Sequence, residues 1–270
     1  MPELPEVETT RRGISPWLTG QTITGVIVRR AALRWPLPDL ATLLPGRTVQ
    51  QVSRRAKYLL LRCGDSGTLL IHLGMSGSLR ILPVETPPQP HDHLDIRFGT
   101  RCLRLRDPRR FGAVLWTDAS PDQHPLLQHL GPEPLSPAFH TDYLYARTRQ
   151  RRAAIKAVLM DGKVVVGVGN IYATEALYAA GIRPDRAACR IARTRLDRLV
   201  DAVQQILGAA IQQGGTTLRD FQQEDGKPGY FRHQLQVYGR ADEPCYHCQT
   251  RLRMQRIGQR SSVYCPHCQH

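Results

Sequence analysis

Four cysteines near the end of the chain most constrain how this sequence can fold. Cys245 and Cys248 form one C-x-x-C pair, sixteen residues follow, and Cys265 and Cys268 form a second pair. Four thiolates provide the closed tetrahedral shell of a structural zinc site. A module of about thirty residues has too little apolar sequence for a core, and zinc binding can supply on the order of 10 kcal/mol of folding free energy. The spacing therefore predicts one structural Zn²⁺ in a zinc ribbon or β-hairpin finger, rather than four unrelated buried thiols.

The remaining cysteines and the start of the chain indicate the cellular compartment. Cys63, Cys102 and Cys189 are isolated in the sequence, which suits a reducing compartment better than a disulfide framework. The first twenty residues are rich in Glu and Arg, unlike a signal peptide, and no apolar run reaches membrane-spanning length. We therefore expect a cytoplasmic protein with no membrane partner.

The charge balance favours a polyanionic partner. Lys and Arg number 37 against 23 Asp and Glu, which gives a formal net charge of +14. The basic residues occur in several segments, so the field covers more than one tail and attracts nucleic acid without distinguishing DNA from RNA. Four arginines that would present a charged edge to phosphates lie between the cysteine pairs: Arg251, Arg253, Arg256 and Arg260.

The beginning of the chain, Met1-Pro2-Glu3, offers a nucleophile. Because Pro2 is small, we expect Met1 to be removed, which leaves the pyrrolidine nitrogen as the α-amine. An α-amine titrates near 8 and a lysine amine near 10.4, so roughly a tenth of the former is unprotonated at neutral pH. A secondary amine that adds to an aldehyde-level carbon gives an iminium, which is a strong electron sink. On these residues alone, a plain chain start before a helix begun by Pro5 is an open alternative.

The first half of the chain has the pattern of a β-sandwich that begins with a helix. Residues 5–18 have helical character, with Pro5 near the start and acidic residues in the first turns. After them the period changes to two, and short strands separated by Gly-, Pro- and Asp-rich turns are predicted at 23–28, 58–61, 69–73, 94–98 and 114–116. This spacing predicts a β-sandwich over residues 1–117, followed by a proline-rich linker at 118–137.

Beyond the linker the apolar spacing becomes helical. Helices are predicted at 143–149, 153–160, 171–180 and 194–213. The segment Gly167-Val168-Gly169-Asn170 precedes one of them; a lone G-x-G is too weak for a dinucleotide site, and a turn that meets a phosphate at a helix N-terminus is the better interpretation. The fold class expected is α+β and multidomain.

Two glycine-flanked turns each carry an apolar residue. Met75 lies in Gly74–Gly77, and Phe111 lies in Asp107–Gly112 beside two arginines. Taken singly, such a residue more often folds back onto the core, although an exposed apolar residue beside arginine can also wedge into a base stack. His91-Asp92-His93 has too few ligands nearby for a second metal site, so phosphate contact or hydrogen bonding within a sheet is favoured.

Taken in order, these motifs resemble one family. The similar segments are 2–9, the surroundings of Lys57, 73–77, 107–112, 166–173, 214–218, 236–240 and the four-cysteine finger. Over essentially the whole chain, they resemble formamidopyrimidine-DNA glycosylase, the bacterial enzyme that removes oxidised purines such as 8-oxoguanine and formamidopyrimidines from DNA. No single motif would be specific, but the ordered set is.

The resemblance implies a domain organisation and a reaction. It implies an N-terminal catalytic β-sandwich at 1–117, the linker at 118–137, a helical helix–two-turn–helix domain with a lesion-recognition loop at 138–230, and a zinc-finger DNA-binding module at 231–270. The partner would be double-stranded DNA with oxidised bases or abasic sites, bound by a monomer. By the same resemblance the protein would be bacterial and associated with the nucleoid when it acts. The damaged base would be flipped out of the duplex, and a lid within Gly214–Tyr230 would close over it.

The catalytic roles follow from the same resemblance. Pro2 would attack the anomeric carbon of the sugar, and Glu3 would act as general acid on the opening sugar. The iminium would then permit successive β- and δ-elimination, with Lys57 as the acid of the first step and Arg260 as that of the second. An arginine is a poor proton donor at its ordinary pKa, so Arg260 is expected chiefly to bind phosphate.

The resemblance also implies the residues that contact DNA. Met75 would fill the vacated stack, Arg109 would face the orphaned cytosine, and Phe111 would wedge the neighbouring step. Phosphates or bases would be held by His91, Arg109, Arg151, Lys156 and Asn170. At Arg151 the family often has lysine, which keeps the charge but changes the geometry of the contact. Glu6 lies in the similar segment 2–9 and Glu175 lies just beyond the segment 166–173, and both would tune the site.

Three alternatives differ from this interpretation. An endonuclease VIII-like enzyme shares the Pro-Glu start and the finger but prefers oxidised pyrimidines; Leu4, Met75 and the intact 107–112 segment favour the purine enzyme. A non-enzymatic zinc-ribbon binder would leave the Pro2-Glu3 start without a role. A hydrolytic nuclease would need a carboxylate cluster for Mg²⁺, and the sequence has no such motif.

Overall fold

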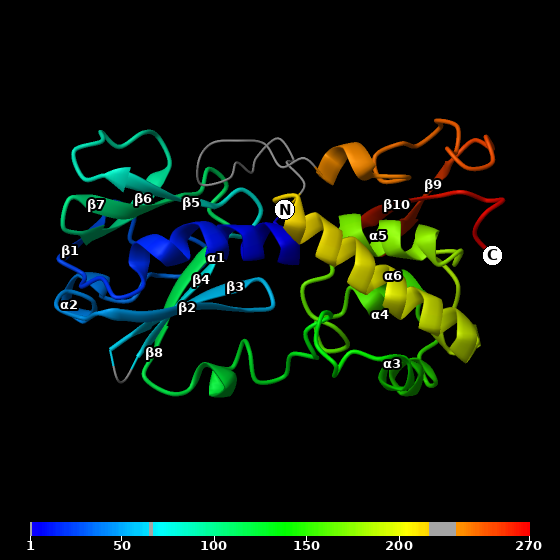
Figure 1. Ribbon diagram of the computed structural model, residues 1–270, viewed down its shortest axis with the longest axis horizontal. Coiled ribbons are helices and arrows are strands. Elements are labelled where there is room, and N and C mark those ends of the chain that lie inside the picture. Colours follow the sequence, from blue (N-terminus) through cyan, green and yellow to red (C-terminus); the bar gives the residue numbers. More distant parts are fainter. Residues whose placement is uncertain (1, 65–66, 216–230) are drawn as a thin grey trace. The chain divides into compact units, whose positions relative to one another are not determined.

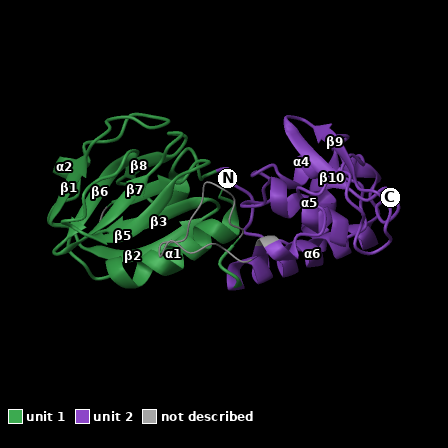
Figure 2. Cartoon of the chain, turned by 90° about the horizontal axis from the view of Figure 1, so that it is seen from above, with its two compact units in different colours: residues 1–128, 213–230 green, residues 129–212, 231–270 purple. Residues whose placement is uncertain are grey.

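The computed structural model describes residues 2–64, 67–215 and 231–270 (Figure 1). The chain forms two compact units, which are coloured separately in Figure 2. The first unit is made of two segments of the chain, one that ends at Gln128 and one that begins at Gln213, and the second unit contains residues 129–212 and 231–270. Most of the predicted lid, residues 216–230, lies outside the described residues.

The first unit is a sandwich of two antiparallel four-stranded sheets (Figure 1). One sheet has the order β1-β6-β7-β5, and the other has the order β2-β3-β4-β8. The first sheet is formed by β1 Gly25–Val28, β6 Asp92–Phe98, β7 Arg101–Arg106 and β5 Ser78–Pro83. The second is formed by β2 Val49–Arg55, β3 Tyr58–Cys63, β4 Thr68–His72 and β8 Ala113–Thr117. The predicted β-sandwich is confirmed.

Helix α1, Leu4–Leu18, begins the unit and packs on its core. The predicted helix at 5–18 is thus present, with its start one residue earlier. The Glu6 carboxylate accepts a hydrogen bond from the Glu3 backbone N–H at 2.8 Å, which satisfies one of the amides that a helix start leaves without a partner. Val7, Ile14 and Leu18 recur at helical spacing and enter one apolar cluster with side chains of both sheets. A short helix α2, Leu40–Leu43, follows β1.

Three of the eight strands, β2, β5 and β7, were not predicted from the sequence. Their sequences, VQQVSRR, SLRILP and RCLRLR, contain arginines that obscure the alternation of a half-buried strand. In β7, Arg104 is 1% exposed and its guanidinium donates two hydrogen bonds to Asp95 of β6, at 2.7 and 2.8 Å. A buried arginine is tolerated here because its charge is paired and its donors are satisfied.

The second unit contains the helices and the finger. Its helices are α3 Thr141–Thr148, α4 Ile155–Leu159, α5 Asn170–Ala179 and α6 Arg193–Gln212, and its strands are β9 Arg253–Ile257 and β10 Arg260–Tyr264. It also has short 3-10 turns at Ala188–Arg190 and Phe231–Gln234, whereas the 3-10 turn at Pro121–Gln123 belongs to the first unit. The four predicted helices are present with shifts of a few residues at their ends. Of the helices in the described ranges, none has the length and apolar character needed to span a bilayer.

Candidate active site

The start of α1 places Pro2 beside two buried carboxyl groups. Pro2 is buried, and Glu3 and Glu6 are each 2% exposed. Gly215 approaches Glu6 so closely that a Cβ there would lie 2.9 Å from Glu6 Oε1, and its φ is +80°. Only glycine fits this position without strain. Because carboxylates are stabilised at the positive end of a helix, α1 provides a favourable place for both acids next to Pro2.

Lys57 lies in the two-residue turn between β2 and β3, where Arg55 pairs with Tyr58. The Arg54 guanidinium donates to the Ala56 carbonyl at 2.8 Å and to Glu8 Oε2 of α1 at 3.2 Å. Burial raises the pKa of Glu8, but hydrogen bonds from arginines of its own helix and the charge of Arg54 outweigh it and hold the pKa below its ordinary value. Arg54 therefore fixes the Lys57 turn to the helix that carries Pro2.

Met75, Arg109 and Phe111 are brought together by two turns whose backbones touch. A Cβ on Gly74, whose φ is +64°, would lie 2.4 Å from the carbonyl carbon of Phe111. The Phe111 side chain is 46% exposed, the Arg109 guanidinium lies 5.0 Å from its ring, and Met75 is half-buried. The sequence alone favoured burial of each apolar residue, whereas Phe111 projects into solvent beside a cation. Such a group of apolar tips and a cation suits insertion into a base stack.

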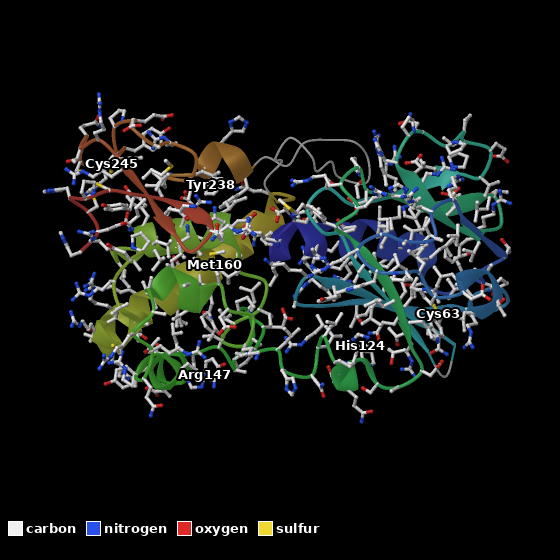
Figure 3. The ribbon with its side chains drawn as sticks, turned by 180° about the vertical axis from the view of Figure 1, so that it is seen from behind. Cys63, His124, Arg147, Met160, Tyr238 and Cys245 are labelled. Carbon is white, nitrogen blue, oxygen red and sulfur yellow. The ribbon has the colours of Figure 1, made fainter. Side chains whose placement is uncertain are left out.

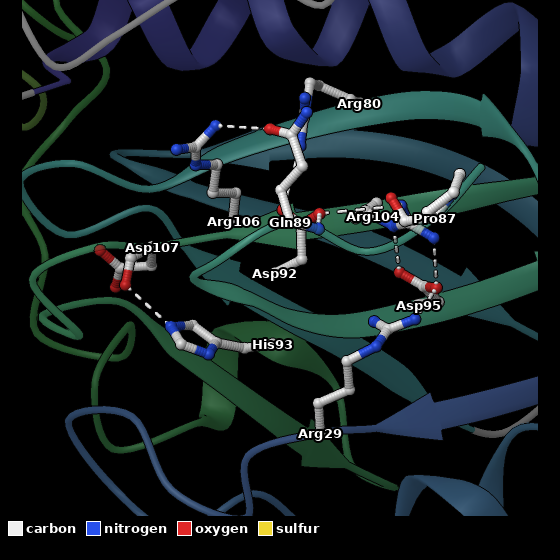
Figure 4. A network of polar contacts seen from close by, with 10 residues as sticks. All are labelled: Arg29, Arg80, Pro87, Gln89, Asp92, His93, Asp95, Arg104, Arg106 and Asp107. Carbon is white, nitrogen blue, oxygen red and sulfur yellow. Dashed lines mark hydrogen bonds and ion pairs between the residues drawn. The ribbon is translucent and has the colours of Figure 1, made fainter.

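His91 is exposed, with a φ of +76°, at the start of β6. Its carbonyl accepts the Asp107 N–H at 3.0 Å. The neighbouring His93 is buried, and its Nε2 lies 2.9 Å from the Asp107 carbonyl oxygen (Figure 4). Hydrogen bonding between neighbouring segments thus accounts for His93, and the exposed ring of His91 is available to a phosphate.

In the second unit, Lys156 is 1% exposed, and its ammonium donates to the Ser261 carbonyl at 3.0 Å and to Ser262 Oγ at 2.7 Å. These serines directly follow Arg260, which is exposed at the start of β10 and pairs with Ile257 across the hairpin turn. Lys156 therefore holds the strand next to Arg260.

Arg151 and Asn170 flank the same helical region. Arg151 donates to Asp161 Oδ2 at 2.9 Å, and both side chains are about one-third exposed. Burial raises the pKa of Asp161, but the hydrogen bond from Arg151 and further donors and charges outweigh it and hold the pKa below its ordinary value. Asn170 is the first residue of α5, and its side-chain oxygen is buried with no hydrogen-bond partner in the described part of the chain. The unpartnered oxygen is an acceptor, so the groups here that suit a phosphate are the donors: the backbone N–H groups of the helix N-terminus and the amide nitrogen of Asn170.

The four cysteines converge as the spacing predicted. All four sulfur atoms lie within 4.8 Å of one another, with Cys248 and Cys265 3.4 Å apart and Cys245 and Cys268 4.0 Å apart. Four sulfurs at ~2.3 Å from one zinc ion would lie about 3.8 Å apart, so the set fits zinc. It is the only cluster of at least three such ligands within the described residues. Cys245 belongs to the finger, and Cys63 is buried in the core of the first unit (Figure 3).

The finger is attached to the helices by polar contacts. Glu175 of α5 is 4% exposed, and its carboxylate accepts three backbone N–H groups, from Gln236 at 2.8 Å, Val237 at 3.0 Å and Tyr238 at 2.7 Å. Gln269 donates to the Ile182 carbonyl at 2.8 Å. Glu175 therefore fixes the chain where it enters the finger, which gives this residue a structural role.

The sequence alone gave no role to Ser76, His72 or the side chain of Asp107. Ser76 Oγ donates to Asp107 Oδ1 at 2.8 Å, and the Gly74 N–H donates to His72 Nδ1 at 3.0 Å. Burial, together with the charge of Lys57, lowers the pKa of His72 to about 4, so its Nδ1 is an acceptor at neutral pH. The only feature of the sequence that points to these three residues is their position in or beside the turns that contain Met75 and Arg109.

The comparisons with known proteins agree with this geometry along the whole chain. Residues 1–114 match the formamidopyrimidine-DNA glycosylase N-terminal domain, residues 130–222 match its H2TH domain, and residues 242–270 match the zinc finger found in FPG and IleRS. The formamidopyrimidine-DNA glycosylases of Syntrophotalea carbinolica and of Stenotrophomonas maltophilia are each 59% identical, with full coverage of both chains.

Solved structures give the same result. The MutM (Fpg) protein of Thermus thermophilus superposes with a TM-score of 0.90 at 38% identity, covering 99% of this chain and 98% of that one. A variant of the Lactococcus lactis FPG in complex with DNA containing Fapy-dG superposes with a TM-score of 0.92 at 33% identity and full coverage. The fold and the site define a zinc-finger DNA glycosylase. The chain belongs to the formamidopyrimidine-DNA glycosylase family.

Proposed function

We propose that this protein excises oxidised purines from double-stranded DNA and then cleaves the abasic strand, with Pro2 as the nucleophile. The observation that carries the proposal is the placement of Pro2 beside buried Glu3 and Glu6 at the start of α1. The full-length relatives are formamidopyrimidine-DNA glycosylases. The Lactococcus lactis structures hold DNA with Fapy-dG or an abasic site. In the cell, the DNA of the bacterial nucleoid would be the substrate.

The chemistry requires Pro2 as a free secondary amine, hence removal of Met1. Its nitrogen attacks the anomeric carbon of the flipped nucleotide, the base leaves, and the sugar ring opens to an iminium. Glu3, 2% exposed, is placed to give a proton to the opening sugar. Glu6 accepts the Glu3 backbone N–H and so fixes the backbone that carries the acid.

The elimination steps need proton transfer near the phosphates. Lys57, in the turn held by Arg54, is assigned to the β-elimination. Arg260, exposed at the hairpin tip, is assigned to the δ-elimination as a phosphate ligand that stabilises the leaving group, because a guanidinium at its ordinary pKa is a weak acid. Zinc, when bound, supplies folding free energy to the hairpin that carries Arg260 and takes no part in the chemistry.

The two touching turns are assigned to base displacement. Met75 replaces the flipped base in the stack, Phe111 wedges the next step, and Arg109 faces the base opposite the lesion. Support comes from the exposure of Phe111 and from the Arg109 guanidinium over its ring. Flipping costs a few kcal/mol, which such insertion offsets.

Phosphate contacts are assigned to His91, Arg151 and Asn170, whose exposed ring, partly exposed guanidinium and helix-terminal amide suit them. Lys156 contributes through the strand that it holds, because two hydrogen bonds tie its ammonium to Ser261 and Ser262.

Borohydride trapping tests the proposal. With duplex containing 8-oxoguanine opposite cytosine and no Mg²⁺, the processed protein should form a covalent adduct whose cross-linked peptide begins at Pro2. A form that retains Met1 should lose the adduct, and Pro2→Gly should weaken it strongly, while Pro121→Gly, in the proline-rich linker, should trap normally. An adduct mapped to Lys57 would refute Pro2 as the nucleophile. Faster excision of thymine glycol than of 8-oxoguanine would refute the substrate class.

A further inference from the structure

The Asp107 carboxylate joins the two turns that are assigned to base displacement. Asp107 is fully buried, yet it has no ion-pair partner among the described residues. Its Oδ1 accepts from Ser76 Oγ at 2.8 Å, in the Met75 turn, and its Oδ2 accepts from the Gly112 N–H at 2.8 Å, in its own turn. A buried carboxylate without a cation is costly, so the two donors are its main compensation.

Ser76 completes the connection, because its hydroxyl oxygen also accepts a hydrogen bond from the Arg109 backbone N–H at 3.1 Å. Ser76 is 3% exposed and immediately follows Met75. One hydroxyl thus contacts the carboxylate that organises the Asp107–Gly112 turn and the backbone of Arg109. The positions of Met75, Arg109 and Phe111 are coupled through this single group.

The backbone of Asp107 is anchored in the sheet on which the turns stand. Its N–H donates to the His91 carbonyl, and its carbonyl lies 2.9 Å from His93 Nε2 (Figure 4). Next to this anchor, β6 and β7 are joined by the buried pair of Arg104 and Asp95. Asp107 therefore has a fixed main chain and a side chain that reaches across to the neighbouring turn.

We propose that Asp107 and Ser76 form a positioning bridge that holds Met75, Arg109 and Phe111 as one inserting unit, and that the bridge sets both the efficiency of base displacement and the selection of the opposite base. This inference rests on the proposed function, because it explains how the residues assigned to base displacement are held in position. Neither residue touches the reacting sugar; each acts through the side chains it positions. Loss of the bridge should slow excision of a paired lesion, which needs displacement, more than cleavage at an abasic site, which has no base to displace.

Ser76→Ala removes the bridging oxygen, and Ser78→Ala is the matched control, because Ser78 begins β5 two residues later and, within the described residues, its hydroxyl makes no hydrogen bond to Asp107. In single-turnover assays, Ser76→Ala should excise 8-oxoguanine opposite cytosine about ten-fold more slowly, equivalent to ~1.4 kcal/mol. Cleavage of an abasic duplex should stay within about two-fold of wild type. The preference for cytosine over adenine opposite the lesion should shrink by roughly the same ten-fold. Ser78→Ala should match wild type in all three.

Two further variants make the outcome decisive. Ser76→Thr keeps the hydroxyl and should recover most of the excision rate and the opposite-base preference. Asp107→Asn keeps one accepting oxygen in place of two and should lower excision relative to abasic cleavage, with zinc content and circular dichroism unchanged. An equal fall in both activities of folded Ser76→Ala, or no difference from Ser78→Ala, would overturn the bridge. Failure of the proposed function would look different, because wild type itself would then neither excise 8-oxoguanine nor give a trapped adduct.

Discussion

Replacing Lys156 by Met separates two ways in which a buried cation can support DNA binding. The variant keeps an unbranched apolar stem of similar length but removes the ammonium that donates to the Ser261 carbonyl and to Ser262 Oγ. If Lys156 acts by holding β10, the protein should lose stability and the placement of Arg260. If it acts as a direct phosphate ligand, DNA binding should change and stability should not.

The magnitude follows from the two hydrogen bonds. Hydrogen bonds to a charged group contribute about 1.5–3 kcal/mol each, so these two contribute about 3–6 kcal/mol. Removing the ammonium also relieves the desolvation cost of a side chain that is 1% exposed, so we expect a net loss of about 2–4 kcal/mol. For a chain of this length each kcal/mol lowers Tm by about 2–4 °C, so Tm should fall by roughly 10 °C.

Thermal denaturation of the zinc-loaded full chain and DNA binding at several salt concentrations measure both effects. We expect log K against log salt to have a slope of roughly −4 to −5 in wild type. In Lys156→Met the slope should be shallower by up to about 0.9, because a misplaced Arg260 loses its phosphate contact, and binding should be weaker. Lys163→Met is the matched control, because Lys163 is exposed in the same unit, and Tm should change little. An unchanged Tm in Lys156→Met, together with weakened DNA binding, would refute the structural role and show that Lys156 itself contacts a phosphate.

Three other changes give separate tests. Burial holds the pKa of His72 at about 4 against an ordinary value of 6.5. As pH falls below 6.5, the unfolded imidazole takes up a proton and the folded one does not, so the free energy of unfolding decreases by up to about 3 kcal/mol between pH 6.5 and 4. In urea titrations, His72→Gln should flatten that decline. Cys248→Ser should lower bound zinc from one equivalent to none by metal analysis and weaken DNA binding, whereas Cys189→Ser should keep both. Gly74→Ala places a methyl group against the facing turn and should cost at least about 2 kcal/mol in chemical denaturation, more than Gly46→Ala, which has a similar φ but open space.

The sequence predicted the helices and the metal site, because each is recognisable from a pattern of residues close together in the chain. Helical spacing located α1 and α3 to α6, and two C-x-x-C pairs located the metal site. It did not predict β7, because Arg104 breaks the apolar alternation and its partner Asp95 lies on another strand. Such a residue becomes compatible with a core only through a contact between strands, and neither segment alone carries that information.

In the candidate site, too, some residues were predictable from local motifs, whereas the contacts that support them were not. Motifs that resemble the family located Pro2, Lys57, Met75 and Arg109, but their support was not predictable from residue type. Ser76 and Asp107 are 31 residues apart and meet only because two turns pack backbone against backbone. The glycines of these turns suggested loops in general, whereas the close approach that requires Gly74 exists only in the folded unit.

The orientation of the finger depends on its contacts with the helices as well as on its metal site. The metal site is formed by four cysteines of the finger, and Tyr178 Oη of α5 lies 3.2 Å from Cys245 Sγ, so one metal ligand contacts the helices directly. Orientation comes from side chains of the helical region, because Glu175 binds the entering backbone at residues 236–238 and Lys156 binds β10. Both are charged groups buried in the second unit, where a lost partner is expensive. A finger that keeps its zinc but loses either contact should therefore remain folded while it misplaces Arg260, so metal content alone is an incomplete measure of a competent finger.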